Sequence, residues 1–233
     1  MKLVNEESLS LSVILPCLDE GAALEHSIRE AKSFMKRLGI SGEIIVADNG
    51  STDDSRDTAL SSGAVLVTEK RRGYGFAIRK GLSVSRGSVI IISDADATYD
   101  LARPDSFFFP LKEDRADVVL GNRFRGKIGR GAMPFSHRLG SSFLSLLGRL
   151  RFGVGVGDFH CGLRSVRRSA LEKMDLKTGG MEFATEFIGV SAKNRLRIRE
   201  VPTDLKRSRF KRHSKLNVFR DGFRHLFVIL KGC

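Results

Sequence analysis

The sequence predicts an α/β fold built on a doubly wound, mostly parallel sheet with helices on both faces. Short aliphatic runs alternate with longer segments whose apolar residues recur about every 3.6 positions, and this alternation is typical of βαβ units. The run Val89–Ile92 contains only Val and Ile, a composition typical of a strand that is buried on both faces of a parallel sheet. A chain of 233 residues is long enough for one large domain with a sizeable core.

The N-terminal half of the chain predicts four strands with a helix between each strand and the next. The strands are short and rich in Val, Ile and Leu, and we expect them at Leu11–Leu15, Glu43–Ala47, Ala64–Val67 and Val89–Ile92. We expect the first helix at Ala22–Leu38 and the second from the cap residue Thr52 or Asp53 to Ser61. The third is opened by Lys70–Gly75 and runs through Ser85. Pro16 is expected to end the first strand, and Gly39 the first helix.

The alternation is less regular after Asp100. We expect strands at Asp117–Leu120 and Val201–Leu205, a turn or strand at Asp158–Ser165, and a turn or helix at Pro104–Leu111. Amphipathic spacing predicts helices at Arg138–Phe152, Met181–Lys193 and Asn217–Leu230. We therefore expect one α/β domain over residues 1–205, followed by a basic loop and an amphipathic C-terminal helix over residues 206–233.

The formal net charge of +13 is unevenly distributed. Residues 1–120 carry 15 basic and 19 acidic side chains, whereas residues 121–151 carry 7 basic and no acidic ones, and residues 195–233 carry 12 and 3. Such asymmetry predicts an anionic partner, which the charge alone leaves open as phosphate groups, a membrane surface or nucleic acid. The C-terminal helix, in particular, fits either an anionic membrane interface or a position on the core of the domain itself.

Several classes of protein are disfavoured by the sequence. Three widely spaced cysteines indicate no disulfide framework and favour a reducing compartment. No P-loop or G-x-S-x-G motif is present, and His160 and Cys161 have no partners at zinc-site spacing. The N-terminus does not resemble a signal peptide, and the late apolar run Leu226–Leu230 is too short to span a bilayer.

Polar side chains follow the predicted strands at the points where the strands end. Asp94 and Asp96 follow Val89–Ile92 and are separated only by Ala95. The other strands are followed by Pro16, Glu20, Asp48, Asn49 and Arg123. Because ligands of open α/β sheets bind outside the carboxyl ends of the strands, we expect these residues to share one crevice. Two carboxylates there predict a site for Mg²⁺ or Mn²⁺, cations that prefer oxygen ligands and often share their shell with substrate phosphates.

Four stretches carry a resemblance to a known family, namely Pro16–Glu20, Ile45–Asp53, Ser93–Asp100 and Gly121–Arg123. They resemble the nucleotide-sugar half of the inverting family-2 glycosyltransferases with the GT-A fold. Later stretches narrow the resemblance to the dolichyl- or polyprenyl-phosphate sugar synthases, of which dolichol-phosphate mannosyltransferase is the best-known member; these are Asp158–Arg164, Met181–Glu186, Glu200–Pro202 and Arg212–Lys215. Residues 1–205 would then form the GT-A catalytic domain.

The resemblance implies roles for the residues of the crevice. Glu20 and Asp48 would contact the ribose and base of the donor nucleotide, and Asp94 would lie beside its diphosphate. Asp96, with Asp94, would bind the metal ion, and Arg123 would approach the phosphates. The remaining positions of the donor site would be Pro16, Asn49 and Ala95. Asn49 stands where the family usually has a second Asp.

The resemblance also implies an acceptor side. Glu182 or Glu186 would line it or reach the metal, which makes these two, with Asp96 and Arg123, the candidate catalytic residues. The acceptor phosphate would be bound by basic or hydroxyl side chains, namely Arg138, Arg164, Arg212, Ser214 and Lys215. The last three match a loop that closes over phosphate in this branch, although His213 replaces the usual glycine.

The reaction implied is metal-dependent transfer of a hexose, with inversion, from a nucleotide sugar such as GDP-mannose or UDP-glucose to a polyprenyl phosphate. It implies a peripheral protein on the cytoplasmic side of a membrane and no nucleic-acid partner. Two alternatives remain open: a family-2 enzyme that acts on a sugar hydroxyl, and a basic polyanion-binding protein. A nucleotidyltransferase would usually carry a glycine-rich basic loop after its first strand, but Pro16–Gly21 is acidic.

Overall fold

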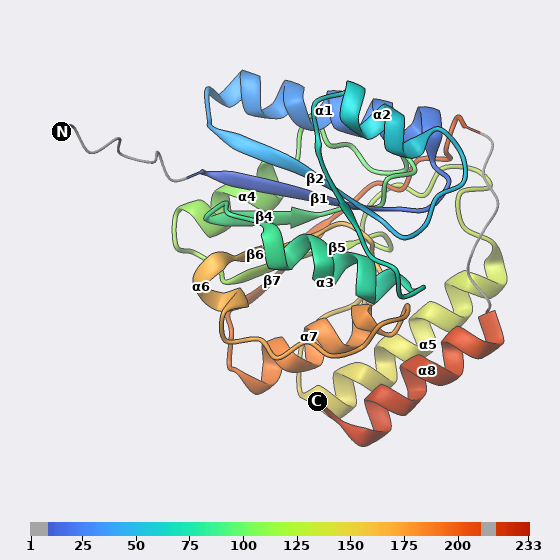
Figure 1. Cartoon of the computed structure of the whole chain (residues 1–233). Coiled ribbons are helices and arrows are strands. Elements are labelled where there is room, and N and C mark those ends of the chain that lie inside the picture. Colours follow the sequence, from blue (N-terminus) through green and yellow to red (C-terminus); the bar gives the residue numbers. More distant parts are fainter. Residues whose placement is uncertain (1–8, 211–217) are drawn as a thin grey trace.

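The computed structural model describes residues 9–210 and 218–233, which form seven strands and eight helices (Figure 1). The strands are β1 (Leu11–Cys17), β2 (Gly42–Asp48), β3 (Val65–Thr68), β4 (Val89–Ile92), β5 (Val118–Asn122), β6 (Arg164–Arg167) and β7 (Ile198–Pro202). The helices are α1 (Gly21–Leu38), α2 (Ser55–Ser61), α3 (Tyr74–Val84), α4 (Asp105–Lys112), α5 (Phe135–Phe152), α6 (Arg168–Leu171), α7 (Phe183–Lys193) and α8 (Val218–Lys231).

The strands form one mixed sheet in the order β3-β2-β1-β4-β6-β5-β7. The pairs β1–β2, β2–β3, β1–β4 and β5–β7 are parallel, and only β6 runs antiparallel to its neighbours β4 and β5. The expected doubly wound, mostly parallel sheet is therefore confirmed. Because β1 and β4 lie in its centre, the residues after β1, β2 and β4 meet at one edge of the sheet.

The expected bounds of the first and last strands were wrong, and those of β2, β3 and β5 differ by one or two residues. The first strand continues through Pro16 to Cys17, because β4 ends its pairing with β1 at Ile14 and no neighbour on that side requires an amide N–H from the proline. The last strand is Ile198–Pro202 rather than Val201–Leu205, since pairing with β5 fixes its register. Arg199 and Glu200 interrupt the apolar run, so the sequence pattern did not indicate the start of this strand. Charged residues of this kind are common in edge strands.

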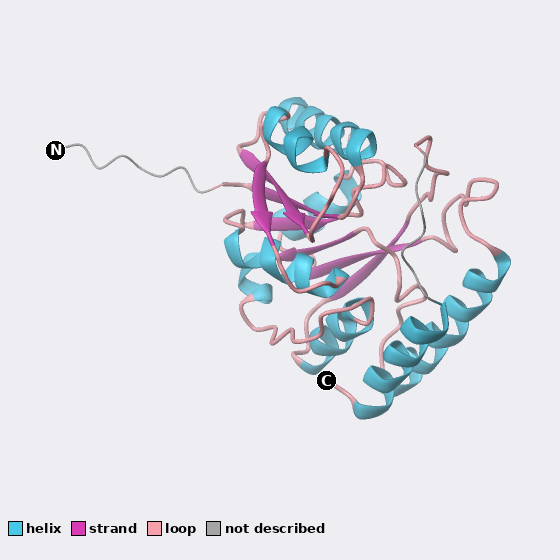
Figure 2. Cartoon of the chain, turned by 45° about the vertical axis from the view of Figure 1, so that its right-hand side comes forward, coloured by secondary structure: helices cyan, strands magenta, loops and turns pink. Residues whose placement is uncertain are grey.

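Helices cover both faces of the sheet (Figure 2), and each face has its own hydrophobic core. Along β1, Val13 and Leu15 point to the face covered by α1 and α4, whereas Ile14 points to the face covered by α3 and α7. Phe34 and Phe108 fill the first core and meet edge to face at 5.7 Å between ring centroids. Both cores are apolar, and the packing of helices on both faces keeps the strand ends in fixed positions.

Helices α5 and α8 lie side by side on the α7 side of the molecule (Figures 1 and 2). Helix α8 docks through the buried side chains of His225, Val228 and Ile229. The His225 Nδ1 atom lies 2.7 Å from Thr185 Oγ1 of α7, and its ring meets that of His160 edge to face at 4.5 Å. The predicted C-terminal helix therefore packs on the domain, while its Phe223, Phe227 and Leu230 face outward.

No helix within residues 9–210 and 218–233 is long and apolar enough to span a bilayer. The predicted division of the chain at residue 205 stays a prediction. Around this position Leu205 forms a parallel bridge with Ile128, and the Lys206 N–H donates to Thr98 O at 2.9 Å.

The buried His225 predicts a loss of stability in mild acid. Burial lowers its pKa to about 4 from an ordinary value of 6.5, and burial also lowers the pKa of His160. The unfolded chain thus binds a proton below pH 6.5 that the folded chain binds only near pH 4, so folding is progressively disfavoured across that window. We expect the free energy of unfolding to fall by about 2 kcal/mol between pH 7 and pH 5 from His225 alone.

Urea denaturation at pH 7, 6 and 5 measures this effect. The carboxyl groups of Glu69 and Asp117 have pKa values lowered to about 2 by hydrogen bonds from arginines, so their contribution is lost only at lower pH, as the pH falls below about 4. The variant His225→Asn keeps a polar partner for Thr185 and should flatten the pH profile. An unchanged profile in this variant would contradict the assignment to His225.

Candidate active site

A cavity of about 420 Å³ lies outside the carboxyl ends of β1, β2 and β4. Six of the predicted donor-site residues line it, namely Pro16, Glu20, Asn49, Asp94, Ala95 and Asp96. Helix α3 contributes its N-terminus with Gly73 and Tyr74, and α8 contributes Arg220, Asp221 and Arg224. The crevice expected from the strand-end pattern is therefore present, with the carboxylates of Glu20, Asp94 and Asp96 at the strand ends and with Arg220 and Arg224, beside the buried Asp221, on α8.

Asp94 is held in place by residues that are distant in the sequence. The Tyr74 hydroxyl donates to Asp94 Oδ1 at 2.8 Å. On the other side, the backbone of Gly162 packs so closely that a Cβ there would fall well inside contact distance of Asp94 Oδ2. The Gly162 N–H itself donates to the Tyr99 hydroxyl at 3.0 Å. The position of the Asp94 carboxylate thus depends on Tyr74 and on the absence of a side chain at residue 162.

Asp96 is 5% exposed and its orientation is fixed locally. Its Oδ1 atom accepts hydrogen bonds from the Thr98 N–H at 3.1 Å and from the Thr98 hydroxyl at 2.5 Å. The intervening turn brings Ala97 to φ 57°, a left-handed conformation that the bonds to Asp96 help to maintain. Hydrogen bonds from Thr98, two residues away, therefore orient this carboxylate, while Tyr74 and Gly162, which are distant in the sequence, contact Asp94.

Gly162→Ala is expected to displace Asp94 without unfolding the chain. The added Cβ meets a side-chain carboxylate, which can rotate, whereas the Gly162 backbone has no left-handed φ that would strain an alanine. If Asp94 assists metal binding, the Mn²⁺ concentration at half-maximal activity should rise by roughly tenfold, which corresponds to about 1.4 kcal/mol. Gly155→Ala is the matched control, because nothing lies within 4 Å of its Cβ position. Equal Mn²⁺ dependence in both variants would contradict the role of Asp94.

Asp48 lies behind the cavity wall and is fully buried. Its two oxygens accept hydrogen bonds from the Gly50 N–H at 3.3 Å and the Ser51 N–H at 3.0 Å, and Arg56 approaches to 3.5 Å. The predicted contact of Asp48 with the nucleotide base stays a prediction. In the structure this carboxylate orders the turn after β2, from which Asn49 lines the cavity.

The Asn49 side chain connects the ends of β2 and β3. Its Nδ2 donates to Glu69 O at 3.0 Å and to Arg71 O at 2.8 Å, while its Oδ1 accepts from the Gly73 N–H at 2.7 Å. An amide supplies both donors and an acceptor, which the Asp that is usual at this position in the family does not. The residue that departs from the family pattern therefore orders the segment that leads into α3.

Asn49→Asp is expected to destabilise the protein by roughly 2–4 kcal/mol, because the new carboxylate would face two carbonyl oxygens in a buried position. The loss should be smaller at pH 5 than at pH 8, since a protonated Asp again donates one hydrogen bond. Urea denaturation at the two pH values measures both effects. Asn194→Asp is the control, because Asn194 is exposed and its Nδ2 donates only to Val190 O. Similar losses in the two variants would contradict the bridging role.

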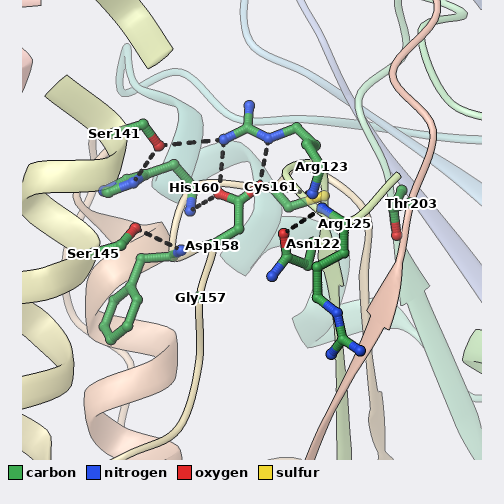
Figure 3. A network of polar contacts seen from close by, with 12 residues as sticks. Asn122, Arg123, Arg125, Ser141, Ser145, Gly157, Asp158, His160, Cys161 and Thr203 are labelled. Carbon is green, nitrogen blue, oxygen red and sulfur yellow. Dashed lines mark hydrogen bonds and ion pairs between the residues drawn. The ribbon is translucent and has the colours of Figure 1, made fainter. Parts of the chain in front are cut away.

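Arg123 forms a nearly buried ion pair with Asp158 (Figure 3). Its Nε and Nη2 atoms donate to the two Asp158 oxygens at 2.7 and 2.8 Å, and its backbone N–H donates to Oδ2 at 3.1 Å. The side chains are 12% and 0% exposed. Burial by itself would lower the pKa of the guanidinium, but the hydrogen bonds that Arg123 donates to the Asp158 carboxylate raise that pKa above its ordinary value. The predicted phosphate contact of Arg123 stays a prediction, and the structure shows this residue joining β5 to the Asp158–Gly162 loop.

The predicted acceptor-side residues are not gathered in this cavity. Glu182 and Glu186 line a second hollow, between α7 and α8, and Glu186 accepts hydrogen bonds from the backbone of Lys177 and Thr178. Arg164 is buried and donates to Ala184 O and Cys161 O, and Arg138 is exposed on α5. The remaining three, Arg212, Ser214 and Lys215, lie outside the described residues.

Sequence reasoning missed several residues of the site. Tyr74 precedes Asp94 by 20 residues and Gly162 follows it by 68, so no local motif links them to it. The amphipathic pattern of α8 indicated a helix but not that Arg220 and Arg224 would line the same cavity as Asp94. A contact of this kind becomes visible only once the chain is folded.

A model of the family described as glycosyl transferase family 2 matches residues 12–175. The match includes the turns after β1, β2 and β4, and hence every carboxylate on the sheet side of the cavity. The chain belongs to glycosyltransferase family 2. As a member of this family it has the fold that the resemblance implied, whereas the dolichyl-phosphate branch stays a prediction.

Two relatives of this family-2 chain align along nearly its full length. It is 34% identical over 222 residues to the low-salt glycan biosynthesis hexosyltransferase Agl6 of Haloferax volcanii. This alignment covers 95% of this chain and 53% of Agl6. The chain therefore spans about half the length of that relative. It is 28% identical over 224 residues to an uncharacterized protein of Methanocaldococcus jannaschii, covering 94% of this chain and 90% of that protein.

The fold is similar to that of glucosyl-3-phosphoglycerate synthase from Mycobacterium tuberculosis. The structure of that enzyme with Mn²⁺, uridine diphosphate and glucosyl-3-phosphoglycerate aligns with a TM-score of 0.70 at 23% identity, covering 95% of this chain and 78% of the synthase. A second structure of the same enzyme contains Mn²⁺ and UDP-glucose and aligns with a TM-score of 0.69. These alignments confirm the expected GT-A-like α/β fold.

The carboxylates of the cavity fit a hard divalent cation. Asp94 and Asp96 would offer oxygen ligands, and among the described residues no group of three or more His, Cys, Asp and Glu side chains is placed to bind a metal ion by itself. This is the donor set of a Mg²⁺ or Mn²⁺ ion that takes its other ligands from substrate phosphates and water. A site for zinc would require more protein ligands, including His or Cys.

Proposed function

We propose that this chain transfers a hexose from a nucleoside diphosphate sugar to a polyprenyl phosphate, with inversion and with Mg²⁺ or Mn²⁺ in the site. The observation that carries the proposal is the arrangement of charge in one cavity. Asp94 and Asp96 lie at the end of β4, and Arg220 and Arg224 approach from α8. A bound cation would let an anionic diphosphate approach the carboxylates, and the arginines offer planar donors for a second phosphate.

A phosphate acceptor suits the side chains of this cavity. Its second pKa is about 6, so it is largely ionised near neutral pH and needs no strong general base to become a nucleophile. Neither histidine nor lysine lines the cavity within the described residues. The nucleophilic oxygen would attack the anomeric carbon as the bond to the diphosphate breaks, and the electron pair of that bond would leave with the diphosphate.

The diphosphate leaving group is where the protein must act, because negative charge develops on it as the glycosidic bond breaks. The cation, when bound, supplies electrostatic stabilisation of that charge. Asp96 and Asp94 would bind the cation. A hydrogen bond from Thr98 orients the Asp96 carboxylate, and one from Tyr74 orients the Asp94 carboxylate. Pro16 and Glu20, at the end of the neighbouring strand β1, line the same cavity, and we place the nucleoside against them.

A thermal-shift panel with GDP-mannose, UDP-glucose and UDP-N-acetylglucosamine, in Mn²⁺ and in EDTA, tests the donor site. A ligand that binds only the folded state raises the melting temperature by mass action. We expect one nucleotide base to give a shift that is lost in EDTA. No shift from any nucleotide, combined with salt-sensitive binding to DNA, would favour the polyanion-binding alternative instead.

Turnover with the donor so identified tests the acceptor. Polyprenyl phosphate, 3-phosphoglycerate and a free hexose represent a lipid phosphate, a soluble phosphorylated acid and a sugar hydroxyl. We expect a radiolabelled sugar to enter the lipid phase only with polyprenyl phosphate. Transfer to either soluble acceptor alone would overturn the lipid-phosphate proposal, while it would leave the donor site intact.

A further inference from the structure

Large apolar side chains are exposed on two neighbouring helices. Of the ten that are exposed within residues 9–210 and 218–233, eight belong to α5 and α8, and they are Phe135, Leu139, Phe143, Leu146, Leu150, Phe223, Phe227 and Leu230. Their exposed fractions run from 49% to 79%. Isolated exposed apolar residues are common, but a cluster of this kind usually marks a contact surface.

The apolar stripe of each helix points away from the core. In α5 the buried residues are small, Ser145 and Gly148, and the Gly148 backbone packs against the Phe159 ring. At 100° per residue, Leu139 and Phe143 lie on the opposite side of the helix from these two. The fully buried residues of the helix are therefore small ones, while five of its large apolar residues are exposed, which reverses the usual arrangement for a helix on a domain surface.

The two stripes form one surface, which we call the α5/α8 face and define by the eight exposed apolar residues. The helices run side by side in both views (Figures 1 and 2). In α8 the buried His225 and Val228 face the core, and Phe227 and Leu230 lie on the outer side. Near the end of both helices, the Arg151 side chain reaches Gly232.

The exposed charged side chains that α5 and α8 themselves carry are all basic, and the exposed acidic side chain that lines a hollow together with Phe223 and Phe227 is Asp175, which is paired with Lys177. The exposed charged residues of the described parts of α5 and α8 are Arg138, Arg149, Arg151, Arg220, Arg224 and Lys231. The single acidic residue there, Asp221, is 2% exposed and is paired with Arg220. An anionic bilayer has negatively charged headgroups above an apolar acyl region. An apolar face bordered by basic side chains complements both layers of such an interface.

We propose that the α5/α8 face docks this chain on an anionic lipid bilayer, with the eight apolar side chains in the interface and the basic residues among the headgroups. Both helices take part, so the C-terminal helix alone is an incomplete docking element. Arg220 and Arg224 belong to this region and also line the cavity, which places the cavity beside the bilayer. The surface follows from exposure and charge, and only its link to a lipid acceptor rests on the proposed function.

Vesicle flotation of the whole chain tests the docking surface without any substrate. We expect binding to phosphatidylglycerol-containing vesicles that weakens with salt, and at least tenfold weaker binding to pure phosphatidylcholine. The triple variant Leu139→Gln, Phe143→Gln and Leu230→Gln should bind the anionic vesicles at least roughly tenfold more weakly. The control is Leu60→Gln with Val65→Gln, which changes the other two exposed large apolar residues and should bind like the unaltered chain.

Single tryptophans provide a second readout, because the chain contains none. We expect the emission of Phe143→Trp and of Leu230→Trp to shift to shorter wavelength with anionic vesicles and to be quenched by brominated lipid. Leu60→Trp, on the far helix α2, should show neither change. A shift at Leu230 without one at Phe143 would overturn the two-helix surface, because docking would then use α8 alone.

Other outcomes also decide the proposal. It is overturned if anionic vesicles do not bind, if the triple variant binds as well as the unaltered chain, or if neutral vesicles bind equally. Light scattering could instead show that the unaltered chain is a dimer and that the triple variant is a monomer. If no vesicles bind either, this result would assign the face to a contact with a second copy of the chain. The nucleotide-induced thermal shift is measured on the same variants, so a failure of docking is distinguished from a failure of the donor site.

Discussion

Asp96→Asn is expected to lower turnover by roughly a thousandfold or more, because it removes a negative charge that would bind the cation facing the leaving diphosphate. The substitution is nearly isosteric. The Asn Oδ1 atom can still accept both hydrogen bonds from Thr98, so the turn after β4 should keep its shape. The variant therefore separates the charge of Asp96 from its structural role, which an alanine would not do.

The measurement is initial rate at saturating Mn²⁺, with urea denaturation of the same sample. Asp100→Asn is the matched control, since Asp100 lies four residues away, is exposed and approaches Lys206 at 3.4 Å. We expect it to keep nearly full activity, and we expect EDTA to inactivate the unaltered chain. Near-normal rates for Asp96→Asn, or for the unaltered chain in EDTA, would contradict the metal-dependent reaction.

Asp158→Ala is expected to reduce the free energy of unfolding by roughly 3–5 kcal/mol. It leaves the Arg123 guanidinium without its partner in a position that is only 12% exposed, and an uncompensated buried charge carries a cost of this size. It also removes the acceptor of the His160 N–H, which donates to Asp158 Oδ1 at 3.1 Å. The Asp158–Gly162 loop should loosen, and with it the wall behind Asp94.

Equilibrium denaturation in urea measures this loss directly. The control is Asp114→Ala, which breaks ion pairs with Arg167 and Arg197 that lie on the surface, where solvent screens them. We expect a much smaller effect there, although two arginines are involved. A loss at Asp158 no larger than that at Asp114 would show that the Arg123 charge is readily solvated once its partner is gone.

The position of the site was predictable from the sequence because it depends on local patterns. Val89–Ile92 is recognisable as a central strand, and strand–helix alternation makes the neighbouring strands parallel. Parallel strands have their carboxyl ends at one edge of the sheet, so Asp94 and Asp96 had to lie near Pro16, Glu20 and Asn49. No long-range contact was needed for this inference.

The details of the site were not predictable, because they depend on contacts between distant segments. The Tyr74 hydroxyl and the Gly162 backbone reach Asp94 only after α3 and the Asp158–Gly162 loop have packed on the sheet. Arg123 carries the charge expected of a phosphate ligand, but its partner is the buried Asp158. A sequence shows which groups can pair, and packing decides which of them do.

The sequence by itself determined the class of fold, the family and the edge of the sheet where the carboxylates gather. Periodicity, turn residues and strand-end motifs act over a few residues, so they are visible in the chain as written. Only the tertiary structure decided what the apolar sides of α5 and α8 contact. A stripe at helical spacing predicts an apolar face but not its partner. The domain packs Phe159 against Ser145 and Gly148 of α5, and so Phe143 and its exposed apolar neighbours on the other side of the helix face outward.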